Sequence, residues 1–100
     1  MNQKNLAIFA SGSGTNAENI IRFFHSDPNI QVRLILSNKK NAYVHERAKK
    51  LNIPSVTFSR EDLYENNTVL NILNQYNIDF IVLAGFLWLV PLSIIRAFSK

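Results

Sequence analysis

Cysteine is absent from this chain of 100 residues, and glycine and proline occur only three times each. The lack of cysteine excludes a disulfide scaffold and a thiolate metal site. It fits a reducing compartment, and we expect the protein to be cytoplasmic. The longest apolar stretch is shorter than the roughly 20 residues that a membrane span needs. No basic-then-apolar leader precedes the first apolar run, so we expect neither a signal peptide nor a membrane partner.

Charge is also sparse, at 18% of residues against 47% hydrophobic, which is typical of a globular domain. The net charge of +4 is mild, and its only doublets are Lys39-Lys40 and Lys49-Lys50. A nucleic-acid surface needs a denser basic stripe with interleaved aromatics, so we expect no nucleic-acid partner. No His, Asp and Glu residues have metal-ligand spacing, so we expect no metal.

Apolar runs alternate with amphipathic runs along the chain. Strands are predicted at residues 6–10, 31–36, 55–58 and 78–84, and helices at 15–25, 42–51, 68–76 and 92–98. Residues 60–65 are interpreted as a loop or short turn. This alternation indicates βαβ units and a parallel sheet. We therefore predict an α/β fold, a Rossmann-like open parallel sheet with flanking helices, built as a single domain over residues 1–100.

Three finer expectations follow from the apolar positions. The first helix is expected to point Ile20, Ile21, Phe23 and Phe24 inward, and the second strand to place residues 32, 34 and 36 on one face. The fourth strand is apolar almost throughout, which predicts burial on both faces. Such a strand is usually central, yet no fifth strand follows it here. We expect an unpaired edge that promotes self-association, and a chain that is the front part of a longer protein.

The turn at residues 11–16, Ser-Gly-Ser-Gly-Thr-Asn, joins the first strand to the first helix. Glycine lets the backbone curl closely around a ligand. The free N–H groups and the dipole of a helix N-terminus favour an anion. The turn therefore predicts a phosphate cradle, with Thr15 and Asn16 as side-chain donors. On this interpretation Gly14→Val abolishes phosphate binding by blocking the approach of the backbone.

The same turn fits other functions. Gly12-x-Gly14-x-x-Ala17 matches the dinucleotide fingerprint, but no acid follows the second strand to hold the ribose of NAD. An NADP-binding module remains open, because Lys39 and Lys40 can meet a 2′-phosphate. The Gly-Lys-Ser/Thr of NTPase phosphate loops is missing. A tight turn that serves packing and binds nothing is the remaining alternative.

Three segments together resemble one enzyme family. The turn at 11–16, Leu-Ser-Asn-Lys at 36–39 and Val-Leu-Ala-Gly-Phe at 82–86 occur in the order and spacing of the phosphoribosylglycinamide formyltransferases. The resemblance covers nearly the whole chain. It implies the formyltransferase fold and a role in purine synthesis. It also implies that Gly14, Thr15 and Asn16 hold the phosphate of glycinamide ribonucleotide.

The resemblance further implies a pocket for the formyl donor, 10-formyltetrahydrofolate. Leu87, Trp88, Leu89 and Val90 would line it, with backbone groups bonding the pterin and side chains forming an apolar slot. Arg60 occupies the place where the family often has an arginine near the folate or the phosphate. Trp88 departs from the basic residue that is frequent in the family at its position.

The family's reacting residues, an Asn-x-His pair and a later Asp, have no match in this chain. The two histidines, His25 and His45, are expected at helix surfaces or ends, away from the carboxyl ends of the strands. Asp79 and Glu18 are given no role. We therefore expect a chain that binds substrates weakly and does not catalyse. A non-catalytic nucleotide-binding module and a formyltransferase-fold relative with another acceptor remain alternatives.

Overall fold

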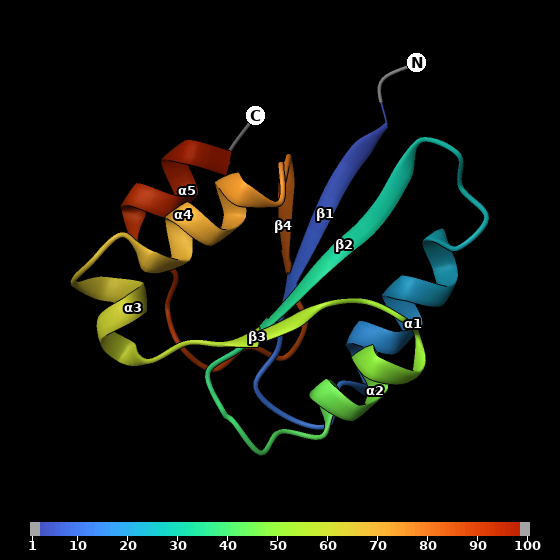
Figure 1. The fold of residues 1–100 in the computed structure, drawn as a ribbon, viewed down its shortest axis with the longest axis horizontal. Coiled ribbons are helices and arrows are strands. Elements are labelled where there is room, and N and C mark those ends of the chain that lie inside the picture. Colours follow the sequence, from blue (N-terminus) through green and yellow to red (C-terminus); the bar gives the residue numbers. More distant parts are fainter. Residues whose placement is uncertain (1–2, 99–100) are drawn as a thin grey trace.

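The computed structural model describes residues 3–98 (Figure 1). The strands are β1 (Lys4–Phe9), β2 (Ile30–Ser37), β3 (Ser55–Thr57) and β4 (Phe80–Leu83). The helices are α1 (Thr15–Phe24), α2 (Val44–Lys50), α3 (Arg60–Tyr64), α4 (Thr68–Gln75) and α5 (Leu92–Phe98). Within the described residues no helix is long and apolar enough to cross a membrane.

The four strands form one sheet in the order β3-β2-β1-β4, and every pairing is parallel. This arrangement confirms the predicted α/β fold with an open parallel sheet. β1 lies between β2 and β4, and its residues from Leu6 to Phe9 are all buried. The continuous apolar run at this strand is what a strand covered on both faces requires.

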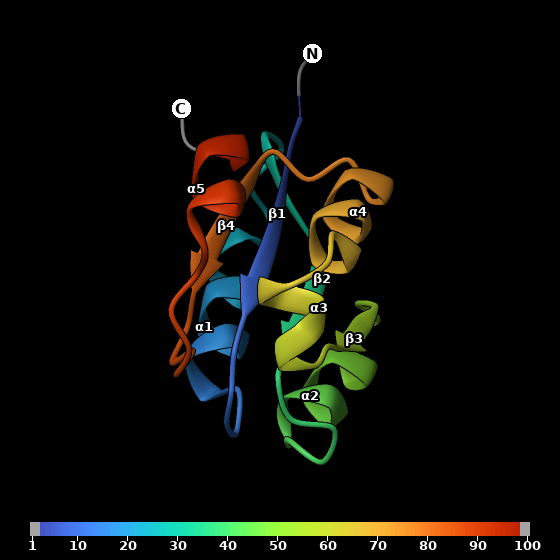
Figure 2. The same cartoon turned by 90° about the vertical axis from the view of Figure 1, so that its left-hand side faces the viewer.

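Helices cover both faces of the sheet (Figure 2). One face packs against α1 and α2, and its buried residues are Ile8, Ala10, Ala17, Ile21, Ile35, Val44, Ala48 and Ala84. The other face packs against α3, α4 and α5, and its buried residues include Ala7, Phe9, Leu34, Leu36, Leu63, Val69, Leu73, Ile94 and Phe98. Side chains alternate along β1 between these two cores, as the pleat of a strand dictates.

A register shift in β2 corrects the predicted face of Val32. Leu6 pairs with Val32 but Ala7 pairs with Leu34, so Arg33 is an extra residue on β2. Because a bulge moves the residues before it to the other face, Val32 packs against the α1–α2 core while Leu34 joins the opposite core. The prediction that residues 32, 34 and 36 share a face was therefore wrong for the first of them.

Two predictions of burial were also wrong. Phe23 is 78% exposed on α1, while Ile21 is buried and Phe24 half-buried, because the inward stripe of this helix is narrower than expected. β4 is half-buried rather than buried on both faces, and Leu83 at its end is exposed. The physical reason is the strand order, which leaves β4 at an edge of the described sheet. Self-association through this edge stays a prediction.

Residues 60–65 contain a short helix, α3, where a loop or turn was expected. Ser59 is its N-cap, and the Ser59 side chain accepts a hydrogen bond from the Asp62 backbone N–H at 3.1 Å. The Asp62 carboxylate accepts one in return from the Ser59 N–H at 3.0 Å. This reciprocal capping box satisfies two donors at the helix start. Backbone bonding holds the pKa of Asp62 below its ordinary value.

Candidate functional site

A small cavity lies at the carboxyl ends of β1 and β4. It has a volume of about 130 Å³. Its lining consists of Gly12, Ser13, Gly14, Thr15, Asn16, Ala84 and Gly85. The chain leaves β1 toward β2 on one side, and β4 pairs with β1 on the other. This is the switch point of the sheet, where open α/β folds bind their ligands. The cavity therefore joins the glycine turn predicted from the sequence to the segment that follows β4.

The glycine turn presents unpaired donors to this cavity. Gly14 is the N-cap of α1 with φ of 83°, and no side chain caps the helix. The first backbone bond of the helix runs from the Glu18 N–H to the Gly14 carbonyl. The N–H groups of Thr15, Asn16 and Ala17 come before it, so they have no partner within the helix. An anion at this place satisfies them and gains from the helix dipole.

A hydrogen bond fixes the segment after β4 against the turn. The buried Ser11 hydroxyl accepts a bond from the Leu87 backbone N–H at 3.0 Å, across 76 positions of sequence. Gly85 has φ of 72°, in the left-handed region that glycine adopts without cost. The bond from Leu87 to Ser11 joins the two walls of the cavity, and Gly85 lets the chain turn between β4 and Leu87.

The first turn of α2 packs against the glycine turn. The Val44 N–H donates to the Gly12 carbonyl at 3.3 Å. A Cβ atom placed on Gly14 would lie 2.6 Å from Val44 Cγ2 and 2.9 Å from Val44 Cα. Gly14 is therefore needed for close packing on α2. A valine at this position would therefore strain the turn against α2. The predicted blocking of phosphate binding by Gly14→Val stays a prediction.

Glu18 belongs to an ion-pair network that the sequence did not reveal. Arg47 of α2 donates from Nη1 to Glu18 Oε1 at 2.6 Å and from Nε to the Ser13 carbonyl at 2.7 Å. Arg22 pairs with the other Glu18 oxygen at 2.7 Å. These bonds, with Arg47 first, hold the pKa of Glu18 below its ordinary value of 4.5. The arginines also neutralise a carboxylate that would otherwise repel an anion near the turn.

Replacing Arg47 with methionine tests this network. Loss of the Arg47 guanidinium should raise the pKa of Glu18 toward 4.5, and the carboxyl signal of Glu18 in an NMR pH titration reports it. Because the folded-state pKa is lowered, the network stabilises the fold above pH 4.5 and is lost as pH falls through the lowered pKa. Arg22→Met is the control, with a smaller rise. Equal titration curves for wild type and Arg47→Met would contradict the assignment.

The structure brings together two of the residues predicted for the donor pocket. The Arg60 guanidinium carbon lies 4.7 Å from the centre of the Trp88 ring and 5.4 Å from that of Tyr64. The Tyr64 hydroxyl donates to the Leu89 carbonyl at 2.5 Å. A guanidinium over an indole is a favourable cation–π arrangement. The first and last residues of α3, Arg60 and Tyr64, therefore hold the segment around Trp88 in place.

The other residues of the segment divide between core and surface. Val90 and Trp88 are half-buried against the core on the α3–α5 side. Leu87 and Leu89 are 72% and 85% exposed. Two large apolar side chains in water, beside a half-buried indole, offer an apolar contact surface.

Neither histidine lies at the cavity. His25 is exposed at the end of α1. His45 was expected away from the carboxyl ends of the strands, and this was wrong. Its Nε2 lies 3.2 Å from the Lys39 carbonyl, after β2, and 3.1 Å from the Thr57 hydroxyl at the end of β3. Because the carbonyl only accepts, Nε2 donates to it, and Nδ1 lies 2.9 Å from the Ser55 hydroxyl. His45 thus ties α2 to β3.

Asp79 lies at the opposite end of the sheet from the cavity. Asp79 accepts a bond from the Asn5 N–H at 2.8 Å, at the amino ends of the strands as expected.

Between residues 3 and 98 no group of three His, Asp or Glu side chains is placed to hold a metal ion. One buried polar atom in the same range, Asn38 Oδ1, has no hydrogen-bond partner. Asn38 follows β2, beside the polar loop that leads to α2.

A second, larger cavity of about 360 Å³ lies at the other end of the sheet. Its lining comes from the end of α1, the start of β2 and the segment after α2, and includes Phe24, Asp27, Gln31 and Asn52. Parallel sheets bind ligands at the carboxyl ends of their strands, and this cavity is at the amino ends. The smaller cavity at the switch point is therefore the candidate functional site.

The chain is similar to known proteins over nearly its whole length. The family model of the formyl transferases matches residues 4–100. The chain is 33% identical to the chloroplastic phosphoribosylglycinamide formyltransferase of Arabidopsis thaliana, covering 98% of this chain and 36% of that protein. It is 32% identical to the phosphoribosylglycinamide formyltransferase of Dictyostelium discoideum, covering 95% of this chain and 52% of that protein.

A solved structure shows the same fold. Glycinamide ribonucleotide transformylase 1 from Geobacillus kaustophilus superimposes with a TM-score of 0.87 at 35% identity, covering 98% of this chain and 55% of that chain. The chain thus spans between about a third and about half of the length of these relatives. On the match across nearly its whole sequence, the chain belongs to the formyl transferase family.

Proposed function

We propose that this chain supplies the phosphate-binding part of a phosphoribosylglycinamide formyltransferase of the cytoplasm. Such an enzyme transfers a formyl group from 10-formyltetrahydrofolate to glycinamide ribonucleotide in purine synthesis. The observation that carries the proposal is the cavity at the switch point, lined by the glycine turn and the segment after β4. The names of the relatives support the same activity.

Gly14, Thr15 and Asn16 hold the substrate's phosphate in this proposal. The N–H groups at the start of α1 face a dianion, and the Thr15 hydroxyl and Asn16 amide add side-chain donors. Hydrogen bonds to a charged group contribute about 1.5–3 kcal/mol each. Two side-chain donors therefore make a contribution that a binding measurement can resolve.

The pocket for the formyl donor, 10-formyltetrahydrofolate, is formed in this proposal by Arg60, Leu87, Trp88, Leu89 and Val90. The exposed side chains of Leu87 and Leu89 and the indole of Trp88 provide an apolar slot for a flat ring system. The bond from Tyr64 to the Leu89 carbonyl fixes the backbone there. The Arg60 guanidinium, held over the indole, is the positive group that meets an acidic part of the donor.

The transfer itself needs groups that this chain does not contain. The substrate amine attacks the formyl carbon, a C–N bond forms, and the bond from the formyl carbon to the folate nitrogen breaks. The amine loses a proton and the folate nitrogen gains one. Donors must stabilise the oxyanion between these steps. Because no Asn-x-His occurs in the sequence, we expect binding by the 100-residue chain without turnover.

Removing the two side-chain donors tests the phosphate assignment. We expect Thr15→Val and Asn16→Leu each to weaken the binding of glycinamide ribonucleotide by about tenfold to a hundredfold, since about 1.4 kcal/mol corresponds to a factor of ten. Calorimetric titration measures the dissociation constants. Asn74→Leu, at an exposed position of α4, is the matched control and should leave them unchanged.

Two other ligands separate the alternatives in the same titration. Ribose 5-phosphate bound as tightly as glycinamide ribonucleotide would point to a family member with another acceptor. If NADPH binds more tightly than both sugar phosphates, and the double variant Lys39→Ala/Lys40→Ala loses this binding, the chain is a nucleotide-binding module. Affinity for glycinamide ribonucleotide that survives both Thr15→Val and Asn16→Leu would refute the phosphate assignment.

A further inference from the structure

The net charge of the chain is concentrated in one segment. Residues 37–51 contain five of the eleven basic residues and one of the seven acidic residues, so this segment alone carries +4. The remaining six basic and six acidic residues cancel. The segment contains two lysine doublets separated by nine positions, one before α2 and one at its end.

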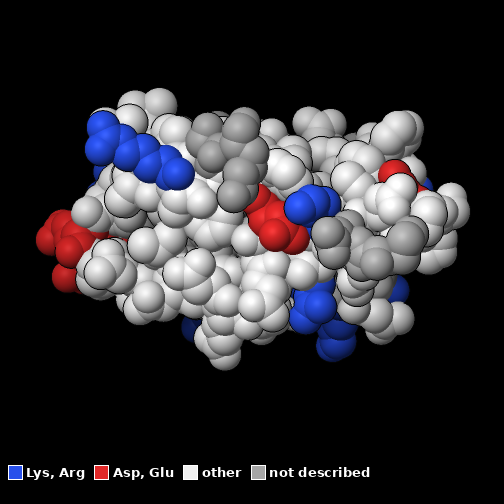
Figure 3. All heavy atoms as spheres, turned by 90° about the horizontal axis from the view of Figure 1, so that it is seen from above, with Lys and Arg blue, Asp and Glu red and all other residues white. Residues whose placement is uncertain are grey.

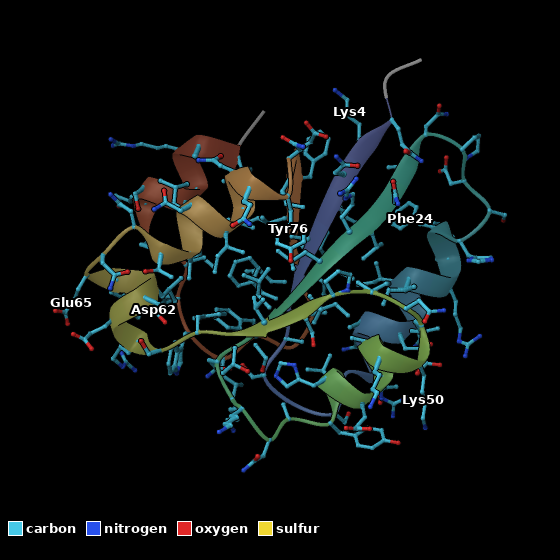
Figure 4. The ribbon with its side chains drawn as sticks, viewed as in Figure 1. Lys4, Phe24, Lys50, Asp62, Glu65 and Tyr76 are labelled. Carbon is cyan, nitrogen blue, oxygen red and sulfur yellow. The ribbon has the colours of Figure 1, made fainter. Side chains whose placement is uncertain are left out.

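Four exposed lysines of this segment form what we call the basic surface: Lys39, Lys40, Lys49 and Lys50. The first two lie in the loop after β2 and the last two at the end of α2. The loop is held against the helix, because the Lys39 carbonyl accepts a bond from Ala42 at 3.2 Å and faces His45 Nε2 at 3.2 Å. Lys50 projects from α2 at the end of the molecule opposite Lys4 (Figure 4).

The basic surface adjoins the glycine turn. The first turn of α2 touches the turn through Val44 and Arg47. Lys49 comes five residues after Val44, about 8 Å along a helix that rises about 1.5 Å per residue. Charges act over about 30 Å at 0.01 M salt and about 8 Å at 0.15 M. At low salt all four lysines therefore act on an anion approaching the turn.

Opposing charges near this surface are few. Glu46 is the exposed acid of α2, and Glu18 is neutralised by Arg47 and Arg22. Asp62 and Glu65 are on the α3 side in Figure 4, across the molecule from Lys50. Asp27 lines the larger cavity together with Leu51 and Asn52, which follow Lys50. The end of the molecule where the strands begin shows basic and acidic side chains side by side in Figure 3, with no single sign prevailing.

We propose that the basic surface steers phosphorylated ligands to the glycine turn, raising their rate of association. This inference rests on the proposed phosphate site, and it goes beyond the residues that hold the ligand. No lysine lines the cavity, so the basic surface does not grip the bound phosphate. Oriented charge beside a site raises association rates of anions by about 10-fold to 1,000-fold, with strong salt dependence. The partner that fits this surface is a small sugar phosphate.

The test compares two variants of equal net charge. Lys39→Gln/Lys40→Gln/Lys49→Gln removes three charges from the basic surface, and Lys4→Gln/Arg33→Gln/Arg96→Gln removes three from elsewhere. Association and dissociation rates of ribose 5-phosphate and of glycinamide ribonucleotide are measured on the 100-residue chain by ³¹P line-shape analysis at 10 and 150 mM salt. The first variant should lose about tenfold in association rate at low salt and about twofold at high salt. Its dissociation rate, and both rates of the second variant, should stay within about twofold of wild type.

Three results would overturn the inference even if the sugar phosphates bind. Equal losses in both variants would show an effect of net charge alone. A change confined to the dissociation rate would show direct contact. A single-stranded oligonucleotide bound more tightly than either sugar phosphate would assign the surface to nucleic acid. If the basic surface speeds the association of ribose 5-phosphate while glycinamide ribonucleotide binds no more tightly than ribose 5-phosphate, the result supports steering and refutes glycinamide ribonucleotide as the substrate. If neither sugar phosphate binds, both proposals fail.

Discussion

Gly14→Ala should destabilise this protein by about 2–5 kcal/mol. A residue with a side chain pays about 1–2 kcal/mol to adopt the left-handed backbone that Gly14 has. The added Cβ would lie 2.6 Å from Val44 Cγ2 and 2.9 Å from its Cα, and such overpacking costs about 1–3 kcal/mol more. Small domains are stable by only about 5–15 kcal/mol. Urea unfolding followed by circular dichroism measures the loss.

Gly12→Ala is the matched control for this prediction. No atom lies within 4 Å of a Cβ placed on Gly12, and its φ is outside the left-handed region. Its stability should therefore change by no more than about 0.5 kcal/mol. Equal stability of the two variants would contradict the role given to Val44 in packing against the turn.

Phe58→Ala should cost about 3–5 kcal/mol, the usual range for a buried phenylalanine. The Phe58 ring is 2% exposed and contacts three other rings at its edges. Its centre lies 5.8 Å from Phe9, 5.9 Å from Phe86 and 6.2 Å from Trp88. Removal of the ring takes away the aromatic contact of Phe86 and Trp88 with Phe58. We therefore expect loss of order at Trp88 as well as loss of stability.

Trp88 is the only tryptophan of the chain, so its fluorescence reports this effect without labelling. The native emission of Phe58→Ala should shift to longer wavelength as water reaches the indole. Phe23→Ala is the control, because Phe23 is 78% exposed and its loss should cost no more than about 0.5 kcal/mol. A Phe58→Ala protein with wild-type emission and the stability of Phe23→Ala would disprove the support assigned to this ring.

Features determined by neighbouring residues were predictable from the sequence. The glycine turn is flanked by an apolar run and an amphipathic run, and both appear in the structure as β1 and α1. The last helix, α5, has the predicted bounds Leu92–Phe98, because Pro91 marks its start. A capping box at Ser59 and Asp62 was also visible in the sequence and would have revealed α3.

Features determined by distant contacts were not predictable. The bond between Arg47 and Glu18 spans 29 positions, and no local pattern indicates it. The bulge at Arg33 depends on pairing with β1, and the exposure of β4 depends on the order of the strands. The need for Gly14 was evident, but its cause, contact with Val44, required the packing of α2. The candidate site was thus predicted in outline, without the helix that supports it.

We propose that the glycine turn and the segment after β4 form one anion site. An amide chemical-shift titration of the 100-residue chain with glycinamide ribonucleotide tests it most directly. We expect saturable shifts that are largest around the cavity of about 130 Å³, at Gly14, Thr15, Asn16 and Gly85. Shifts that are largest around the cavity at the amino ends of the strands, at Phe24 and Asn52 for example, would contradict it.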